Sequence, residues 1–83
     1  HKESADRSIP IWERLIALHR EILDADPGNP KRQRELAMAH RMMAYSRSLA
    51  GEDRAAQQHT REAYALNQRR LSAGDRSARP DVA

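Results

Sequence analysis

Three histidines, His19, His40 and His59, are the residues of this 83-residue chain whose type and position could do chemistry. Each falls on the apolar side of a different predicted helix, so the imidazoles could converge, and converging imidazoles could bind a metal ion. His59 and Glu62 also stand at i, i+3 and form a possible ligand pair. The chain has neither an HExxH motif nor a matching acid-x-x-His motif elsewhere. We therefore expect partly buried, hydrogen-bonded histidines and no metal site.

Catalytic motifs are missing from the sequence. It has no Gly-rich phosphate loop, no nucleophile motif and no Cys. Ser46, Ser48 and Ser72 fall within or at the end of predicted helices, with no evident base beside them. A chain of this length also buries too little surface to enclose a deep cavity. We expect a non-catalytic protein without a cofactor.

The positive charge is carried by arginine, which makes up 13 of the 15 Lys and Arg residues. Arginine favours bidentate contacts with carboxylate or phosphate. Arg34 and Arg41, like Arg54 and Arg61, are spaced by seven and share a helix face, but nearby acids interrupt them and the net charge is only +3. This pattern is typical of a solvated face, and as a binding site it favours an acidic peptide over nucleic acid. A small basic helical nucleic-acid-binding domain is the alternative function.

One apolar stripe could bind a partner. Met38, Met42, Tyr45 and Leu49 lie at i, i+4, i+7 and i+11 of the second predicted helix. Methionine is adaptable and frequent on promiscuous binding surfaces, which favours a groove for a peptide or a helix. Apolar stripes at helical spacing are also commonly buried, so a core role, under a neighbouring repeat or a second copy of the chain, stays open.

Three helices must position these residues, over about 9–25, 31–50 and 53–73. Residues 1–8 lack apolar periodicity and predict a flexible lead-in, with Ser8 as the N-cap of the first helix, and residues 75–83 predict a flexible tail. The first helix carries the widest apolar face and should be the most buried, with Trp12 as a core anchor. This face comprises Ile11, Trp12, Leu15, Ile16, Leu18, His19, Ile22 and Leu23.

Breaker residues separate the helices. Pro27, Gly28 and Pro30 interrupt the helical pattern, and Asn29 is placed to cap the helix that follows. Gly51 can adopt the left-handed backbone conformation that closes a helix, and Asp53 can cap the next one. Connections this short predict an antiparallel pair of helices over residues 34–71.

The sequence also shows internal similarity. Shifting the sequence by 48 residues places Leu18 on Leu66 and Leu23 on Leu71. The first helix therefore looks like the second half of a preceding unit, and the chain reads as one and a half copies of a helix-turn-helix repeat.

The central stretch resembles a tetratricopeptide repeat of the diverged type found in bacterial multidomain proteins such as Ser/Thr kinases. Residues 35–44, Gly51, Glu52, Ala56, residues 61–63 and Leu71 carry this resemblance. The sequence departs from the family pattern at His40, Arg47 and Thr60, where a large apolar or aromatic residue would be expected.

The resemblance implies an all-α fold in which a tetratricopeptide-like hairpin follows the trailing helix of another repeat, within a domain at residues 9–74. It implies a protein–protein interaction or scaffolding module that binds a peptide or a helix or self-associates as an oligomer. The implied groove is lined by Met38, Arg41, Met42, Tyr45, Ser48 and Leu49. Because no apolar run approaches the roughly 20 residues of a membrane span, we expect a soluble, cytoplasmic module.

Overall fold

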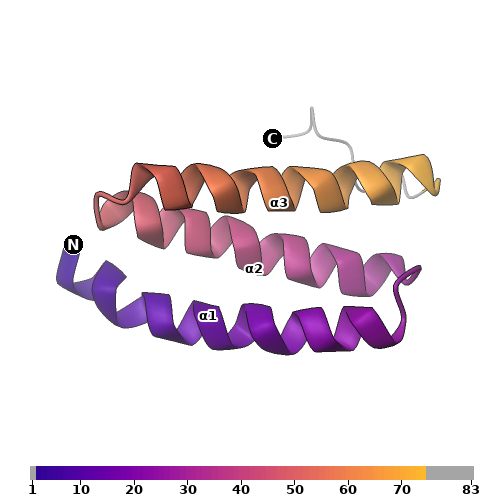
Figure 1. The fold of residues 1–83 in the computed structure, drawn as a ribbon, viewed down its shortest axis with the longest axis horizontal. Coiled ribbons are helices and arrows are strands. Elements are labelled where there is room, and N and C mark those ends of the chain that lie inside the picture. The colour runs from indigo at the N-terminus through magenta and orange to yellow at the C-terminus, as the bar shows by residue number, and fades with distance from the viewer. Residues whose placement is uncertain (1, 75–83) are drawn as a thin grey trace.

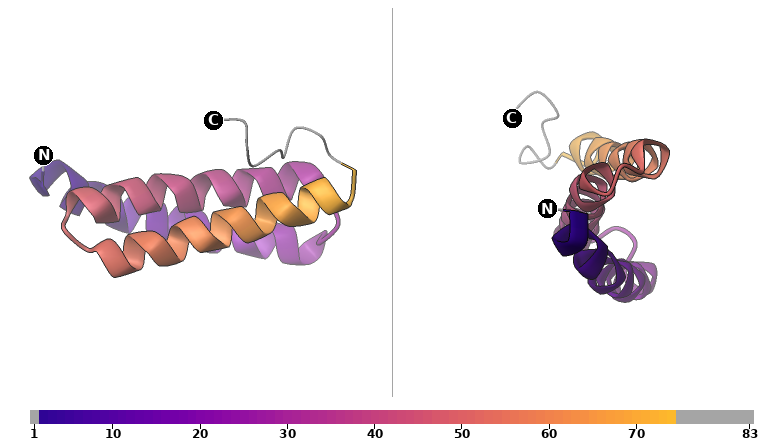
Figure 2. Two further views of the ribbon diagram at one scale, coloured as in Figure 1. Left: turned by 90° about the horizontal axis from the view of Figure 1, so that it is seen from above. Right: turned by 90° about the vertical axis from the view of Figure 1, so that its left-hand side faces the viewer.

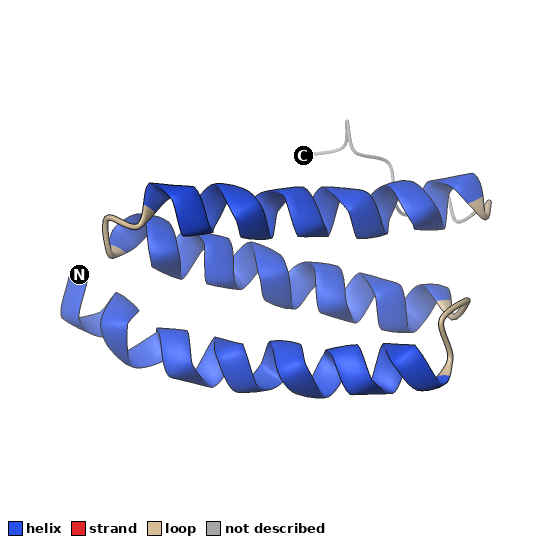
Figure 3. Cartoon of the chain, in the orientation of Figure 1, coloured by secondary structure: helices blue, strands red, loops and turns tan. Residues whose placement is uncertain are grey.

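The structure, a computed structural model, describes residues 2–74 of the chain. Three helices account for most of this segment: α1 (Lys2–Ala25), α2 (Pro30–Leu49) and α3 (Asp53–Ser72). The described residues contain no strand (Figure 3). The prediction of an all-α fold with three helices is confirmed, whereas the predicted tail at residues 75–83 lies outside the described part of the chain.

The helices form a single bent row. Short turns fold successive helices antiparallel, with α2 in the middle (Figure 1). Helices α1 and α3 both pack against α2 and hardly touch each other. The molecule measures 39 × 28 × 16 Å, and the end-on view shows the bend of the row (Figure 2). No helix among the described residues has an apolar stretch that could cross a membrane.

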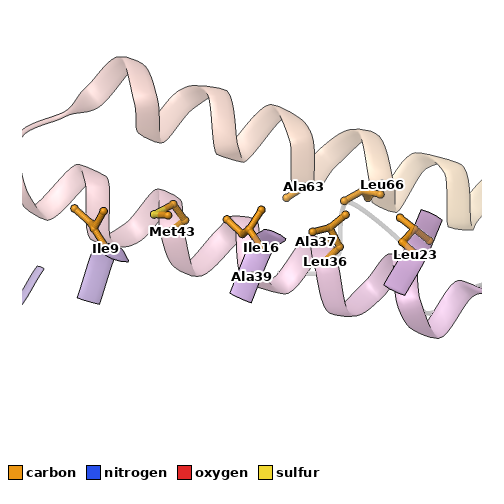
Figure 4. Close-up of a cluster of buried hydrophobic side chains, with 9 residues drawn as sticks. All are labelled: Ile9, Ile16, Leu23, Leu36, Ala37, Ala39, Met43, Ala63 and Leu66. Atoms are coloured by element: carbon orange, nitrogen blue, oxygen red, sulfur yellow. The ribbon is translucent and has the colours of Figure 1, made fainter. Parts of the chain in front are cut away.

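The core lies along the two seams of α2. Its apolar side chains come from all three helices (Figure 4): Ile9, Ile16, Leu23, Leu36, Ala37, Ala39, Met43, Ala63 and Leu66. Trp12 packs against this cluster while partly exposed, so it lies at the edge of the core. The most buried helix is α2, and the prediction that the first helix would be the most buried is wrong. The reason is topological, because α2 has two neighbours and α1 has one.

Helix α1 begins earlier than the sequence predicts. The described residues before Ile9 are helical from Lys2 onward, so neither the lead-in at residues 1–8 nor the N-cap role of Ser8 holds for them. Ala5 is buried, and the Ser8 hydroxyl donates to the Ala5 carbonyl at 2.9 Å and lies 3.0 Å from the Ser46 hydroxyl of α2. Packing against the end of α2 therefore stabilises two turns that have little apolar periodicity of their own.

The turn before α2 agrees with the sequence prediction. The side chain of Asn29 accepts hydrogen bonds from the backbone N–H groups of Lys31 and Arg32, at 3.0 and 3.4 Å. Gly51 and Gly74, after α2 and α3, have φ values of 83° and 94°, the left-handed region that favours glycine.

The start of α3 differs from the prediction. Asp53 is the first helical residue, the N-cap is Glu52, and no side chain caps the helix. The Glu52 carboxylate instead accepts from the Arg47 guanidinium at 3.0 and 3.2 Å. Asp53 keeps a favourable position in the first turn, where a negative charge complements the helix dipole.

Two adjacent methionines test this packing. Met43 is 1% exposed between the helices, whereas Met42 is 39% exposed on the same helix. Met43→Ala should lower the free energy of unfolding by about 2–5 kcal/mol, because it leaves a cavity in the core. Met42→Ala, with the same change of helix propensity, should cost less than about 1 kcal/mol. Urea denaturation followed by circular dichroism measures both, and equal costs would contradict the assigned burial.

Candidate interaction surface

Contacts between α1 and α2 distinguish two faces of the helical row. On one face Arg20 of α1 approaches His40 of α2, and Glu13 pairs with Arg47. We call this the histidine face. His19 of α1 lies 3.6 Å from Glu35 of α2. His19 and Glu35 therefore mark the opposite side of the seam, which we call the methionine face.

The six predicted partner-binding residues all have exposed side chains. Met38, Met42 and Leu49 stand three, seven and fourteen positions after Glu35, so the helical repeat places them on the methionine face. Met38 and Tyr45 are 62% and 64% exposed, and Leu49 is 46% exposed. Arg41 and Ser48 are exposed beside them. The stripe is therefore not part of the core within the described chain.

Two hollows border this stripe. The first, of about 530 Å³, is lined by Met38, Arg41, Met42 and Tyr45. The second, of about 600 Å³, is a groove between α2 and α3 lined by Ala44, Tyr45, Ser48, Asp53, Ala56, Gln57, Thr60 and Arg61. Tyr45 lines both. The first hollow joins four of the predicted residues, the second adds Ser48 and residues of α3 that the sequence prediction missed, and Leu49 lines neither.

Exposed apolar side chains also lie on the outer helices. Ile11 and Leu18 of α1 are 59% and 51% exposed, although the sequence predicted them within a buried face. Tyr64 and Leu71 of α3 are exposed as well. The apolar face of α1 is wider than one neighbouring helix can cover, so the burial of α1 is divided between a packed side and an open side.

The histidines do not converge as a set of three. His40 Nδ1 lies 2.9 Å from His59 Nδ1, whereas His19 contacts Glu35 on the methionine face. The expectation of a hydrogen-bonded, partly buried histidine is confirmed for His59, whereas His40 is hydrogen-bonded and fully buried. Within residues 2–74, no three His, Cys, Asp or Glu side chains gather as a metal ion would require.

Burial sets the protonation of the paired imidazoles. Desolvation lowers the pKa of His40, and the charges of His59 and Arg20 lower it further, while Glu62 raises it. Burial also lowers the pKa of His59, with Arg47 as the next contribution. Both rings are therefore held in the neutral form more strongly than a solvated histidine.

Arg47 links three parts of the fold. Its guanidinium contacts Glu13 of α1 at 2.7 Å and Glu52, in the turn before α3, at 3.0 Å. The ion pair between Arg47 and Glu13 could not be predicted from the sequence, because the two residues are far apart in the chain. The available signal was the departure of Arg47 from the apolar residue that a tetratricopeptide-like pattern would place there.

These features define a small all-α module with one polar, internally bonded face and one face rich in exposed apolar side chains. The chain matches no protein-family model, no curated protein and no solved structure.

Replacing Arg47 tests how much the ion pairs of the histidine face contribute to stability. Arg47→Met keeps the aliphatic stem but removes the contacts to Glu13 and Glu52. Because both carboxylates are about half exposed, the free energy of unfolding should fall by only about 0.5–1 kcal/mol at low salt, and by less at high salt. Arg34→Met, at an exposed position of α2, is the control and should show no such salt dependence. Urea midpoints across a salt series decide between them.

Proposed function

We propose that the chain is a non-catalytic protein–protein interaction or scaffolding module, similar to a tetratricopeptide repeat, whose methionine face binds a helix or peptide of a partner protein. The observation that carries this proposal is the exposed stripe of Met38, Met42, Tyr45 and Leu49. Large apolar side chains that stay accessible along one helix are typical of interaction sites.

The chemistry of the stripe favours a helical or extended ligand. Its i, i+4, i+7, i+11 spacing presents a ridge beside the groove between α2 and α3, and an amphipathic helix inserts anchors at matching intervals. The small side chains of Ala44, Ser48 and Ala56 in that groove let a ligand backbone approach closely. The flexible thioethers of the two methionines can adapt to different apolar anchors.

Charged side chains beside the apolar stripe can orient a bound ligand. Arg41 lines the first hollow and Arg61 lines the second. Two guanidinium groups beside apolar surface suit a ligand with acidic residues flanking its anchors, because arginine pairs with carboxylates in a planar, bidentate geometry.

The shift by 48 residues supports the repeat interpretation. It places Leu15 and Leu18 of α1 on Ala63 and Leu66 of α3, which are buried in the structure. It also places the buried Ile16 of α1 on the exposed Tyr64 of α3. Leu66 is thus buried where the equivalent Leu18 is exposed, and Ile16 is buried where the equivalent Tyr64 is exposed. This is expected when α1 and α3 are the same element of two successive repeats in a longer protein.

A library of acidic amphipathic peptides tests the binding proposal. A peptide selected against the wild-type chain should bind Met42→Glu and Tyr45→Glu at least about tenfold more weakly, a loss of about 1.4 kcal/mol, because each change places a charge in the contact. Gln58→Glu adds the same charge at an exposed position that lines neither hollow and should bind normally. Equal binding by all variants would refute the methionine face. Binding to any polyanion with a steep salt dependence would favour the nucleic-acid alternative.

Self-association is tested by light scattering across a range of chain concentrations, with helix content followed in parallel. Because apolar side chains stay exposed on all three helices, we expect the mass to rise with concentration and Tyr45→Glu to suppress the rise. A wild-type chain that stays monomeric over the whole range would contradict self-association and leave peptide binding as the function of this face.

A further inference from the structure

A chain of polar contacts crosses all three helices on the histidine face. The Arg20 guanidinium of α1 lies 3.5 Å from His40 Nε2 of α2, and His40 Nδ1 lies 2.9 Å from His59 Nδ1 of α3. His40 is 2% exposed, so its ring has little contact with solvent. This chain is independent of the methionine face and goes beyond the proposed function.

The contacts fix the tautomer of each imidazole. A guanidinium can only donate, so His40 Nε2 must accept and His40 must carry its proton on Nδ1. His40 Nδ1–H then donates to His59 Nδ1, which must be unprotonated. His59 consequently carries its proton on Nε2. The whole chain exists only while both imidazoles are neutral.

The surroundings oppose a further positive charge. Arg20 and Glu13 face the pair from α1, Arg47 faces it from α2, and Glu62 faces it from α3. The carboxylate of Glu13 is already engaged with Arg47 at 2.7 Å. A proton added to the pair would therefore stand between two arginines, with Glu62 as the remaining acid.

We propose that Arg20, His40 and His59 form an acid-sensitive cross-link that holds α1 and α3 on α2 at neutral pH and loses one of its two hydrogen bonds when either imidazole takes up a proton. A protonated His40 presents two donors, so it can no longer accept from Arg20. A protonated His59 can no longer accept from His40. The first event removes the contact between α1 and α2, while His40 Nδ1–H still donates to His59, and the second removes the contact between α2 and α3. Each leaves an imidazole N–H without its acceptor and favours separation of one helix from α2.

The direction of the pH effect follows from linkage. Burial holds the pKa of both histidines below the ordinary value of 6.5, so the unfolded chain binds more protons than the folded chain. The stabilisation is complete above pH 6.5 and is lost as the pH falls below that value toward the lowered pKa values. The loss of stability therefore begins, as the pH falls, above the range in which most carboxylates titrate.

Urea denaturation of the full chain tests this proposal. Between about pH 7.5 and about pH 5.5, the unfolding equilibrium constant should rise by about tenfold for each histidine that stays neutral in the folded state. The double variant His40→Leu/His59→Leu replaces both partners with apolar side chains and should lose this rise. His19→Leu removes the histidine of the methionine face and should keep it. A wild-type chain without the rise, or a double variant that keeps it, would overturn the cross-link.

Nitrogen-15 NMR of the wild-type imidazoles gives a second test that needs no variant to fold. Near neutral pH, His40 should be protonated on Nδ1 and His59 on Nε2, and both signals should change together on acidification. A His40 protonated on Nε2 would contradict the hydrogen-bond chain, whatever the variants show.

Discussion

The structure depends on the packing of α2 between two neighbours. Helices α1 and α3 scarcely touch, so removing either seam of α2 would leave a single helix without a partner. Close approach along these seams is possible because several of the buried positions are alanines, among them Ala37 and Ala39 of α2 and Ala63 of α3. Such small side chains bring helix axes together but contribute little apolar area each. The row therefore has a thin core.

Polar cross-links supplement that thin core on the histidine face. His40 and Arg47 stand where a tetratricopeptide-like pattern would place large apolar residues, and each bonds to more than one part of the fold. An apolar side chain at these positions would add buried area without directional preference. Hydrogen bonds and ion pairs instead fix the rotation and register of α1 and α3 on α2, at the cost of sensitivity to protonation and salt.

Local signals in the sequence predicted the helix boundaries best. The Asn29 cap and the left-handed Gly51 depend on backbone geometry within a few residues, and both appear where expected. The early start of α1 could not be predicted in this way. It depends on the burial of Ala5 and on the contact between Ser8 and Ser46, near the distant end of α2, and Ser8 alone carries the signal of a cap.

Periodicity likewise predicted which residues share a face but not what covers that face. In α1 the apolar residues span so wide an arc that Ile16 is buried while Leu18 is exposed. In α2, the predicted stripe that includes Met38 lies on the surface, whereas Met43 lies in the core. Whether an apolar side chain is buried depends on how many helices pack against its own helix. That number is a property of the whole fold. The six residues predicted to bind a partner are therefore all exposed, whereas the residues of α3 that line the adjoining groove could be identified only from the structure.

The two faces are linked through the stability of the row. A ligand seated in the groove between Tyr45 and Thr60 contacts α2 and α3 together, so it binds the packed row more tightly than separated helices. Binding of that kind stabilises the packed state by mass action. The hydrogen bond between His40 and His59 joins the same two helices from the opposite side. Under the two proposals made above, a proton on the histidine face and a ligand on the methionine face would shift one packing equilibrium in opposite directions, without any contact between the two sites.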